Sequence, residues 1–426
     1  MSQTSELDQD YPLSEVPPGQ RKGIVSTSIV LFGFTFFTAT MFAGGKIGLA
    51  FDFKTMILAA VAGNLLLGLY AAVLGYIACR SGLNSVLMGR FCFGETGSKL
   101  SDFLLGFTQV GWYAWGTATI AIVLVRMLGL SPAWTTPLMV VFGFGFSLTA
   151  FVGYKGLDLL SRIAVPAMLV LLLWSLTIAT RDAGGLTGLL AIQPKDSMSW
   201  HMALTLVFGT FVSGATQATN WTRFARDSKT AVWSSLIGFF IGNGLMIVVG
   251  AYGAMVYQQP DVVEVMVLQG LSVAATVMLF LNIWTTQDNT IYNFAAAGCN
   301  LVRQDRRGLI TLVGAGIGTV LAIGGMSDML IPFLILLGSI IPPIGGVIMA
   351  DYFYGRSGRY PQLEGTRLPR FNWVGLSAYA IGAACAYASP WVAPLVGIGV
   401  AALSYVVLFE VQRVRLGRES LSGVDA

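Results

Sequence analysis

Twelve apolar segments, each long enough to cross a lipid bilayer, constrain the fold of this chain more than any other feature. Each contains roughly 17–30 residues, and about 20 suffice for a membrane-spanning helix. The segments run approximately over residues 24–49, 56–79, 101–129, 133–153, 157–180, 200–221, 231–257, 265–299, 309–325, 328–350, 372–388 and 391–412. Only 11% of the 426 residues are charged and 55% are hydrophobic, whereas a soluble domain carries about a quarter charged residues. The composition therefore excludes a water-soluble protein with a large core.

Positively charged residues are unevenly divided between the loops that separate these segments. With the N-terminus placed in the cytoplasm, all but five of the 25 lysines and arginines fall on the cytoplasmic side. The five exceptions are Lys46, Lys54, Arg126, Arg181 and Lys195. Cytoplasmic loops carry an excess of Lys and Arg, and a missed or invented segment would scramble that bias. We therefore expect a multi-pass protein of the cell inner membrane, with twelve spans and both termini in the cytoplasm.

The two ends of the chain are polar. Residues 1–22 lack an apolar core, so we predict no cleavable signal and expect a disordered cytoplasmic tail. Residues 413–426 are expected to form a second cytoplasmic tail. The four cysteines and the single histidine, His201, are scattered without the spacing of a disulfide framework or of a Cys/His metal site.

The sequence repeats itself weakly after about half its length. Three features recur in the same order at offsets of 176–179 residues: Phe32-Gly33 as Phe208-Gly209, Gly63-Asn64 as Gly242-Asn243, and Pro166 as Pro342. Weak internal symmetry among hydrophobic segments is typical of secondary transporters that are built from two structural repeats. We therefore interpret the chain as a secondary transporter.

The repeat and the segment count together predict the architecture. Each repeat contains five spans, and an odd number forces the second copy to enter the membrane from the opposite side. We expect an all-α membrane protein of the leucine-transporter type, a five-plus-five inverted repeat with helices 1 and 6 broken and two extra C-terminal helices. The predicted parts are residues 23–195 for the first repeat, 196–352 for the second, and 353–412 for a cytoplasmic loop with spans 11 and 12.

Glycine and hydroxyl residues lie near the middle of the first span of each repeat. The first span carries Gly33-Phe34-Thr35-Phe36-Phe37-Thr38 and then Gly44-Gly45, and the sixth carries Gly209-Thr210-Phe211-Val212-Ser213-Gly214. Such residues weaken a helix, and unwound backbone is tolerated in a membrane only where it lines a cavity. The alternative is close helix packing through small residues. Recurrence in both repeats favours broken helices, whose free carbonyls can coordinate a cation.

The eighth segment is the most polar stretch at membrane depth. Asn282, Thr285, Thr286 and Asn289 follow the spacing of one helical stripe. Facing lipid they would be costly, so they should face the interior, where their oxygens suit a sodium ion. Hydrogen bonding between helices without an ion is the alternative. Asp288, in the same run, is either a proton-linked or ion-coupling group or a structural hydrogen-bonding partner.

The third segment holds an aromatic ring with an amide neighbour. Trp112 lies near mid-span, where interfacial anchoring does not apply. Gln109 is one turn away, and Phe211 and Ser213 of the broken sixth segment could complete the site. A flat ring with a neighbouring amide suits a planar, hydrogen-bonding heterocycle. Core packing is the alternative for Trp112 considered by itself.

Several longer strings resemble one transporter family. They are Arg21-Lys22-Gly23, Gly44-Gly45, Gly63-Asn64-Leu65-Leu66-Leu67-Gly68, Thr108-Gln109-Val110-Gly111-Trp112, Arg223-Phe224, Asn282-Ile283-Trp284-Thr285-Thr286 and Ile341-Pro342-Pro343-Ile344-Gly345-Gly346. The chain resembles nucleobase–cation symporter family 1, the purine/cytosine permease family, over nearly its whole length.

The resemblance implies a sodium-coupled symporter of a nucleobase, with cytosine as the expected base. It implies sodium bound by the carbonyls near Gly33 and Phe36 and by Asn282, Thr285 and Thr286. It implies a base stacked between Trp112 and Phe211, with Gln109 and Ser213 offering hydrogen bonds. Phe37, Thr38 and Gln287 complete the expected substrate-binding set.

Two residues depart from the family pattern. Gln287 follows the Thr pair where the pattern has Asn, and Asn220 stands before Arg223-Phe224 where the pattern has Asp. The Gln287 departure leaves uracil, hydantoin or allantoin as alternative substrates, and proton coupling remains an alternative to sodium.

The sequence disfavours two other classes of membrane protein, enzymes and sensors. A membrane-embedded enzyme would need a cluster of His, Cys or carboxylates at membrane depth, and a sensor would need an appended soluble domain. Neither is visible in the sequence. We therefore expect no enzymatic activity and no nucleic-acid partner, and a protein that functions as a monomer in the lipid bilayer.

Overall fold

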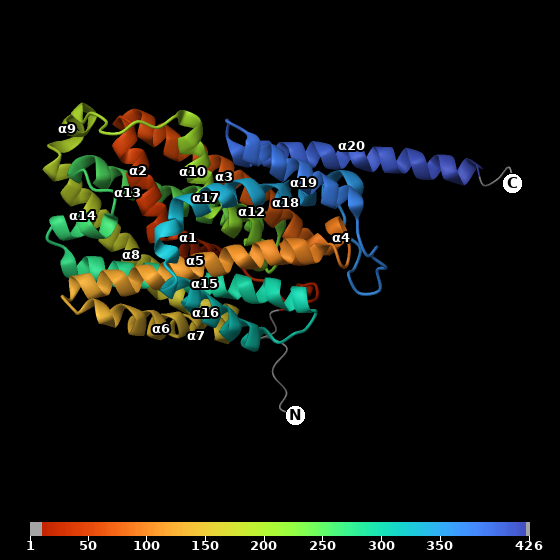
Figure 1. Cartoon of the computed structure of the whole chain (residues 1–426), viewed down its shortest axis with the longest axis horizontal. Helices are drawn as coiled ribbons and strands as arrows, with labels where there is room; N and C mark the ends of the chain where they lie inside the picture. The colour runs from red at the N-terminus through yellow and green to blue at the C-terminus, as the bar shows by residue number, and fades with distance from the viewer. Residues whose placement is uncertain (1–10, 423–426) are drawn as a thin grey trace, which may run out of the picture.

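The computed structural model describes residues 11–422, and these form helices without any β-strand (Figure 1). The first repeat contains α1 (Ile24–Thr35), α2 (Thr38–Ala50), α3 (Phe53–Ser81), α4 (Ser85–Phe93), α5 (Ser98–Met127), α6 (Thr135–Gly145), α7 (Ser147–Val152), α8 (Tyr154–Asp182) and α9 (Gly185–Ala191). The second contains α10 (Trp200–Gln217), α11 (Thr219–Thr222), α12 (Ser228–Ser235), α13 (Asn243–Tyr257), α14 (Val262–Leu268), α15 (Ser272–Val302), α16 (Arg307–Ile323), α17 (Leu330–Ile340) and α18 (Pro342–Ala350). Next come α19 (Trp373–Ala388) and α20 (Ala393–Ser422). Short π-helical or 3-10 turns join several of these helices.

All twelve predicted segments are helical. By length and composition, seven helices of the described chain are apolar enough to cross a membrane: Phe53–Ser81, Ser98–Met127, Pro132–Val152, Tyr154–Asp182, Ser228–Tyr257, Met326–Gly355 and Ala393–Arg415. Two bent pairs, α1 with α2 and α15 with α16, also pass when each pair is taken together. The remaining predicted segments correspond to α10 and to the shorter apolar helix α19.

The first span is broken, as predicted. Helix α1 ends at Thr35 and α2 begins at Thr38, and their axes differ by 59°. Phe36 and Phe37 between them have extended backbone, with ψ of 91° and 130°. The break therefore lies at two phenylalanines and exposes carbonyl groups toward the interior of the bundle.

The sixth span is interrupted more gently. Phe211 has non-helical dihedral angles (φ −136°, ψ 15°) inside α10. A second interruption separates α10 from the four-residue helix α11. The predicted break in this span is confirmed, and its central residue is an aromatic one.

Gly44 and Gly45 do not form a break. Both lie inside α2, where a Cβ on Gly44 would stand 2.2 Å from the Ile247 carbonyl oxygen of α13. A Cβ on Gly48 would likewise meet the Ala251 carbonyl at 2.2 Å. At this site the alternative interpretation was correct, because the small residues let two helix backbones approach closely.

Contacts between the repeats follow the predicted internal symmetry. Asn243 Nδ2 donates to Asn64 Oδ1 at 2.7 Å, so the two repeat-related asparagines bind each other. Gly33 of the first repeat faces α8, and its counterpart Gly209 faces α17. The prolines differ: Pro166 lies inside a continuous α8, whereas Pro342 begins α18 after the end of α17.

The N-terminal prediction was wrong for residues 11–22. Val16 is buried, and Arg21 donates through Nη1 to the carbonyls of Cys79 and Arg223 at 2.9 and 2.8 Å. Lys22 pairs with Ala225 in an isolated β-bridge. The polar composition of residues 11–22 gave no indication of this packing, because most of the hydrogen-bond partners of this segment are backbone carbonyls. Residues 1–10 lie outside the described part of the chain, as do residues 423–426 of the predicted C-terminal tail.

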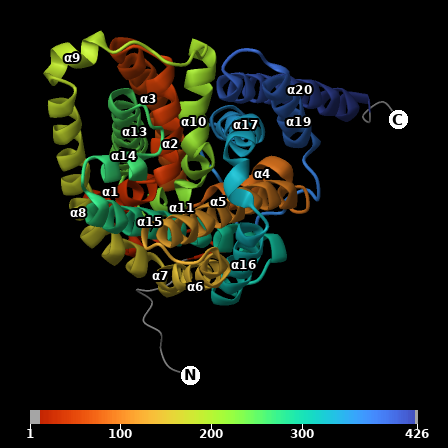
Figure 2. The same ribbon diagram turned by 60° about the vertical axis from the view of Figure 1, so that its left-hand side comes forward.

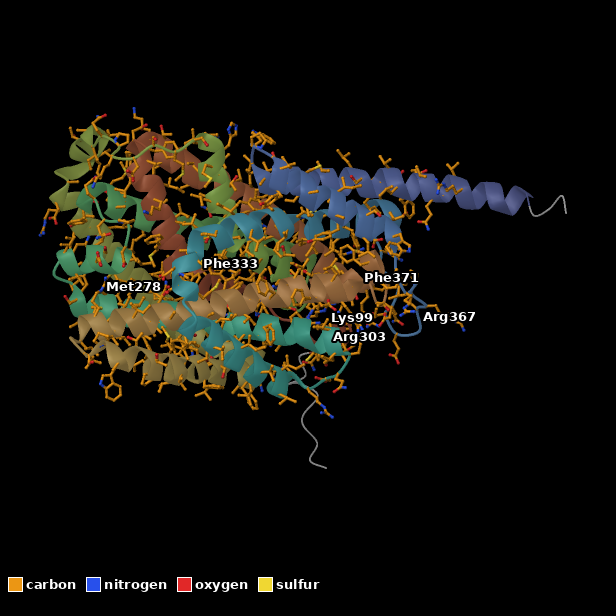
Figure 3. All side chains as sticks on the ribbon, viewed as in Figure 1. Lys99, Met278, Arg303, Phe333, Arg367 and Phe371 are labelled. Carbon is orange, nitrogen blue, oxygen red and sulfur yellow. The ribbon has the colours of Figure 1, made fainter. Side chains whose placement is uncertain are left out.

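The long helices α5, α15 and α20 run along the long axis of the molecule, and α19 and α20 lie at one side of the bundle (Figures 1 and 2). Lys99, Arg303 and Arg367, all predicted to be cytoplasmic, lie at one end of this axis (Figure 3). Met278 lies near the opposite end in the same view. This arrangement agrees with the sorting of basic residues in the sequence.

Candidate functional site

A narrow cavity lies where the two broken spans meet α5 and α15; of its empty volume of about 210 Å³, only about 10 Å³ can hold the centre of a water molecule. Side chains from four spans line it: Phe34, Phe37, Gln109, Trp112, Thr210, Phe211, Ser213, Gly214, Thr286 and Thr290. Of the seven predicted substrate-binding residues, the cavity brings together five: Gln109, Trp112, Phe211, Ser213 and Phe37. We refer to it as the central cavity.

Aromatic rings form most of the apolar wall. Phe37 meets the ring of Trp112 edge to face at a centroid distance of 5.4 Å, and that of Phe211 at 6.3 Å. The ring of Phe34 also meets that of Phe211 edge to face, at a centroid distance of 5.0 Å. Residues of both helix breaks thus hold the rings in edge-to-face contact, a favoured geometry for aromatic pairs.

Polar groups are few, and most of them are already paired. Trp112 Nε1 donates to Ser213 Oγ at 3.2 Å, so the Ser213 hydroxyl proton is free to point elsewhere. Gln109 Oε1 accepts from Asn293 Nδ2 at 3.5 Å. Gln109 Nε2 is buried and has no hydrogen-bond partner among the described residues. A ligand in the cavity would therefore meet an available amide donor.

Thr38 lies outside the central cavity, contrary to the prediction. It lines a second, larger space of about 930 Å³ together with Phe42, Lys46 and Trp115. Its hydroxyl donates to Asn282 Oδ1 at 2.8 Å. The physical reason is that Thr38 starts α2, where the chain has already turned away from Phe37.

Gln287 was also predicted to bind substrate, but in the structure its side chain lies outside the central cavity, against α5. Its Nε2 donates to the carbonyl of Tyr113 and to Thr117 Oγ1 at 3.2 Å, both on α5. Gly116 leaves space for it, because a Cβ there would lie 2.8 Å from the Gln287 side chain. One residue after Thr286 on a helix is about 100° around the axis, so Gln287 faces α5 while Thr286 faces the cavity.

The predicted ion-binding residues are partly assembled. Thr286 Oγ1 donates to the carbonyl oxygens of Phe36 at 2.9 Å and Phe34 at 3.3 Å, across the break in the first span. Thr285 instead bonds carbonyls of its own helix, at Leu281 and Asn282. Asn282 keeps a buried Nδ2 without a partner among residues 11–422. Hydroxyl and carbonyl oxygens are hard ligands of the kind that suit sodium.

Gly33, the fifth predicted ion-binding residue, lies against α8. A Cβ there would stand 2.6 Å from Ser161 Oγ, so a larger residue would require the Ser161 side chain to move. The Ser161 hydroxyl is buried and has no partner in the described part of the chain. It adds an oxygen beside the helix break that the sequence interpretation missed. Nothing in the sequence distinguishes Ser161 from other serines in apolar spans.

Thr290 and Asn293 were also missed. Thr290 lines the central cavity and Asn293 holds Gln109. Both continue the helical stripe of Asn282 and Thr286: the intervals from Asn282 to Thr286, Thr290 and Asn293 are four, four and three residues in turn. Extending that stripe by two turns would have found them.

Asp288 points away from the central cavity. Its carboxylate accepts from Thr149 Oγ1 at 3.1 Å and from Asn289 Nδ2 at 3.0 Å. No cation pairs with it among the ion pairs of the described residues. Trp284 Nε1 donates to the same Thr149 hydroxyl at 3.2 Å, which ties this group to α7.

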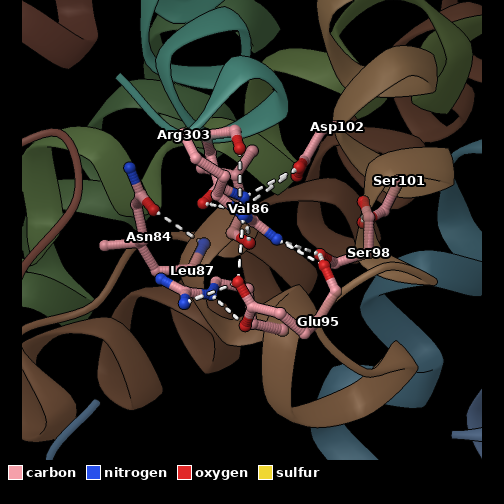
Figure 4. A network of polar contacts seen from close by, with 10 residues as sticks. Asn84, Val86, Leu87, Glu95, Ser98, Ser101, Asp102 and Arg303 are labelled. Atoms are coloured by element: carbon pink, nitrogen blue, oxygen red, sulfur yellow. Dashed lines mark hydrogen bonds and ion pairs between the residues drawn. The ribbon is translucent and has the colours of Figure 1, made fainter. Parts of the chain in front are cut away.

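At the end that carries the basic residues, a polar network joins α4, α5 and α15 (Figure 4). Arg303 Nη2 donates to Ser98 Oγ at 2.9 Å, and its Nε lies 3.1 Å from a Glu95 carboxylate oxygen. Asp102 is buried and accepts from Asn300 Nδ2 at 2.8 Å. Burial lowers the pKa of Arg303, and the carboxylates of Asp102 and Glu95 oppose that shift. The network closes this end of α5 against α15.

The described residues contain no group of three or more His, Cys, Asp or Glu side chains that could hold a metal ion. The four cysteines are free. The polar atoms around the cavity are amides, hydroxyls and carbonyls, groups that suit a neutral heterocycle or a hard monovalent cation.

The chain is similar in sequence to known permeases. Residues 15–408 match the model of the family described as permease for cytosine/purines, uracil, thiamine, allantoin. The chain is 39% identical to the cytosine permease of Escherichia coli (strain K12) over 401 residues, which cover 94% of each protein. It is 23% identical to the hydantoin permease of Microbacterium maritypicum, covering 90% of this chain and 85% of that one.

The fold is similar to those of solved transporters. A nucleobase-cation-symport-1 family transporter, in a closed conformation with bromovinylhydantoin bound, gives a TM-score of 0.82 at 20% identity, covering 95% of both chains. A Na⁺-coupled sialic acid symporter in a substrate-bound, outward-open state gives 0.67 at 12% identity, covering 95% of this chain and 92% of that one. Both likenesses confirm the leucine-transporter type of fold. The chain is thus a multi-pass membrane transporter and not an enzyme, and it belongs to the family of permeases for cytosine/purines, uracil, thiamine and allantoin.

Proposed function

We propose that this protein takes up a nucleobase, with cytosine as its main substrate, by sodium-coupled symport. The observation that carries the proposal is the central cavity, where Gln109, Trp112, Phe211 and Ser213 meet beside Thr286. The relative with 39% identity is a cytosine permease, which supports the choice of base.

Substrate binding follows from the cavity walls. A planar pyrimidine could displace the edge-to-face contacts of Phe37 and lie against the faces of Trp112 and Phe211. Stacking of a base on an aromatic side chain contributes about 1–3 kcal/mol. Gln109 Nε2 and the Ser213 hydroxyl would then orient the base by donating hydrogen bonds.

Sodium would bind beside the break in the first span. Thr286 belongs to both regions, because it lines the cavity and contacts the carbonyls of Phe34 and Phe36. An ion that orders this break also orders the neighbouring Phe37, so ion and base should raise each other's affinity. Such coupling is reciprocal by linkage, which is the basis of symport.

Alternating access needs a path from each side of the membrane. The 930 Å³ space beyond Thr38 reaches Lys46, which is predicted to lie outside, and Asp261 in the loop between the seventh and eighth segments. Trp115 in its wall meets Phe37 at a ring-centroid distance of 5.3 Å. We propose that this space is the outer vestibule and that Phe37 and Trp115 separate it from the base. The termini would lie in the cytoplasm, the membrane would be the cell inner membrane, and the protein would act as a monomer without nucleic acid.

Uptake into proteoliposomes tests the proposal. Purified protein should accumulate radiolabelled cytosine when sodium is imposed outside, and unlabelled cytosine should compete better than uracil, hydantoin or allantoin. Accumulation that ignores the sodium gradient would remove the coupling claim. Stronger competition by another base would change the substrate and leave the coupling claim intact.

Asp288 supports a second candidate, proton-coupled transport. A buried carboxylate without a cation partner is a common feature of proton-linked transporters. Uptake driven by a pH gradient in the absence of sodium, and abolished in Asp288→Asn, would favour this alternative. Sodium-driven uptake that survives in Asp288→Asn would assign the carboxylate a structural role.

A further inference from the structure

Four buried amide side chains form a line from the start of α4 to the central cavity. Asn84 Nδ2 donates to Asn220 Oδ1 at 2.7 Å, and Asn220 Nδ2 donates to Asn293 Oδ1 at 2.7 Å. Asn293 Nδ2 then donates to Gln109 Oε1 at 3.5 Å, the longest link. The four side chains come from four different elements, and each is at most 1% exposed. We call this line the amide relay.

The direction of the relay is fixed at its far end. Asn84 is the N-cap of α4, and its Oδ1 accepts from the backbone N–H of Leu87 at 3.0 Å (Figure 4). A backbone N–H can only donate, so the Asn84 oxygen must face it and the Asn84 NH2 group must face Asn220. The hydrogen-bond partners of an amide determine which way its oxygen and nitrogen point. Here the orientation of Asn84 determines that of Asn220, and the orientation of Asn220 determines that of Asn293.

The near end of the relay is the substrate-facing amide. Because Asn293 donates to Gln109 Oε1, Gln109 must present its Nε2 to the central cavity. That nitrogen is buried and unpartnered among residues 11–422, and the Gln109 residue lines the central cavity. Turning the Gln109 amide around would set two NH2 groups against each other and leave the Asn293 donor unsatisfied, which is costly in a buried site.

We propose that the amide relay fixes Gln109 as a hydrogen-bond donor and thereby selects bases that present an acceptor atom, a ring nitrogen or a carbonyl oxygen, at that point. Asn84, Asn220 and Asn293 are then positioning residues for specificity. Asn220 must be an amide for this purpose, because a carboxylate would accept from both neighbours and could not pass the direction on. The inference rests on the proposed function, since it concerns the base that the central cavity binds.

Asn84→Asp reverses the relay with little change in shape. Aspartate is as good an N-cap as asparagine, and the cap N–H and the helix N-terminus keep its carboxylate ionised near neutral pH. It cannot donate to Asn220, so Asn220, Asn293 and Gln109 should each turn around. Gln109 Oε1 would then face the cavity, and an acceptor atom of the base would meet an oxygen.

The experiment is a double-mutant cycle between Asn84→Asp and Gln109→Leu, read as the dissociation constant of a radiolabelled base in sodium. The base is the tightest binder among cytosine, uracil, hydantoin and allantoin. We expect Asn84→Asp to weaken binding about tenfold or more in the wild-type background. In the Gln109→Leu background the same change should alter binding less than about twofold, because the relay no longer ends on the substrate.

Asn64→Asp is the matched control, since Asn64 is equally buried and bonds Asn243 and the Ala60 carbonyl instead of the relay. It should not weaken binding in a way that depends on Gln109. If Asn84→Asp does not fold, Asn220→Leu interrupts the relay and should show the same dependence on Gln109 with a smaller loss.

Equal weakening in both backgrounds, or none in either, would overturn the inference while leaving base transport in place. Absence of binding of every base to the wild-type protein would instead overturn the proposed function.

Discussion

The two broken spans of this transporter are related by the internal repeat, yet they break in different ways. In the first span two residues, Phe36 and Phe37, leave the helix, and the halves diverge by 59°. In the sixth span a single residue, Phe211, departs from helical geometry and α10 continues past it. The wide break in the first span frees backbone carbonyls from the helix. The narrow break in the sixth span mainly changes the direction of the Phe211 side chain.

Because of this difference, the two repeats contribute different walls to the site. The carbonyls of Phe34 and Phe36 receive Thr286 of α15, which gives the first span the oxygen-rich wall. The Phe211 ring and the Ser213 hydroxyl give the sixth span the wall that faces a flat ligand. We therefore expect substitutions at the first break to act mainly on the ion, and those at the second mainly on the base.

The largest expected effect is at Thr286. Replacing Thr286 by Ala removes a hydroxyl from the proposed ion site, and hydrogen bonds to charged groups contribute about 1.5–3 kcal/mol. The sodium concentration for half-maximal uptake should rise about tenfold to 100-fold. Sodium titration of cytosine uptake at matched expression measures this.

Thr311→Ala on α16 serves as the control, since the Thr311 side chain is buried and its hydroxyl bonds the Arg307 carbonyl of its own helix. A loss of expression equal to the loss of sodium response at Thr286 would mean that the residue is structural.

The next effect tests the second break. Phe211→Ala should weaken cytosine binding by about 1–3 kcal/mol through lost stacking. At saturating cytosine the half-maximal sodium concentration should change far less than in Thr286→Ala. If the two variants shift sodium and cytosine dependence in the same proportion, the two breaks do not have separate roles.

Packing of the unbroken half of the first span gives a smaller effect. Gly44→Ala places a Cβ 2.2 Å from a backbone carbonyl, and overpacking costs about 1–3 kcal/mol. The detergent-solubilised protein should therefore melt several degrees lower. Gly316→Ala on α16 is the matched control, because a Cβ there meets nothing within 4 Å. An unchanged melting temperature for Gly44→Ala would show that α2 and α13 are free to separate.

Sequence reasoning found the repeat, both breaks and most of the cavity because these leave periodic or recurring signals. Trp112 and Gln109 lie one turn apart on one helix, and Phe211 and Ser213 lie at the break of another. Their meeting in one cavity required the inverted repeat, which the offsets predicted. The same reasoning could not tell that Gly33 and Gly44 both pack against neighbouring helices, α8 and α13, while the break itself falls at Phe36 and Phe37.

The errors have a common physical origin. Gln287 and Thr38 are polar residues next to true cavity residues, and about 100° of rotation or one turn of chain decides which way each points. Only the neighbouring helix reveals that direction. Asn220 was noted only as a departure from the family pattern, and its hydrogen bonds to Asn84 and Asn293 could not be predicted, because contacts between amides on different helices have no sequence pattern of their own.

The smallest effect concerns the hydroxyl that the sequence did not reveal. Ser161 Oγ lies beside Gly33 at the first break and is buried without a partner among the described residues. If it helps to bind the ion, Ser161→Ala should raise the half-maximal sodium concentration about threefold, the lower end of a hydrogen bond's contribution. Ser147→Ala, whose hydroxyl bonds the Phe144 carbonyl far from the break in sequence, is the control in the same sodium titration. A Ser161→Ala protein with wild-type sodium dependence would confine the ion to the carbonyls and Thr286, and so would sharpen the division between the two breaks.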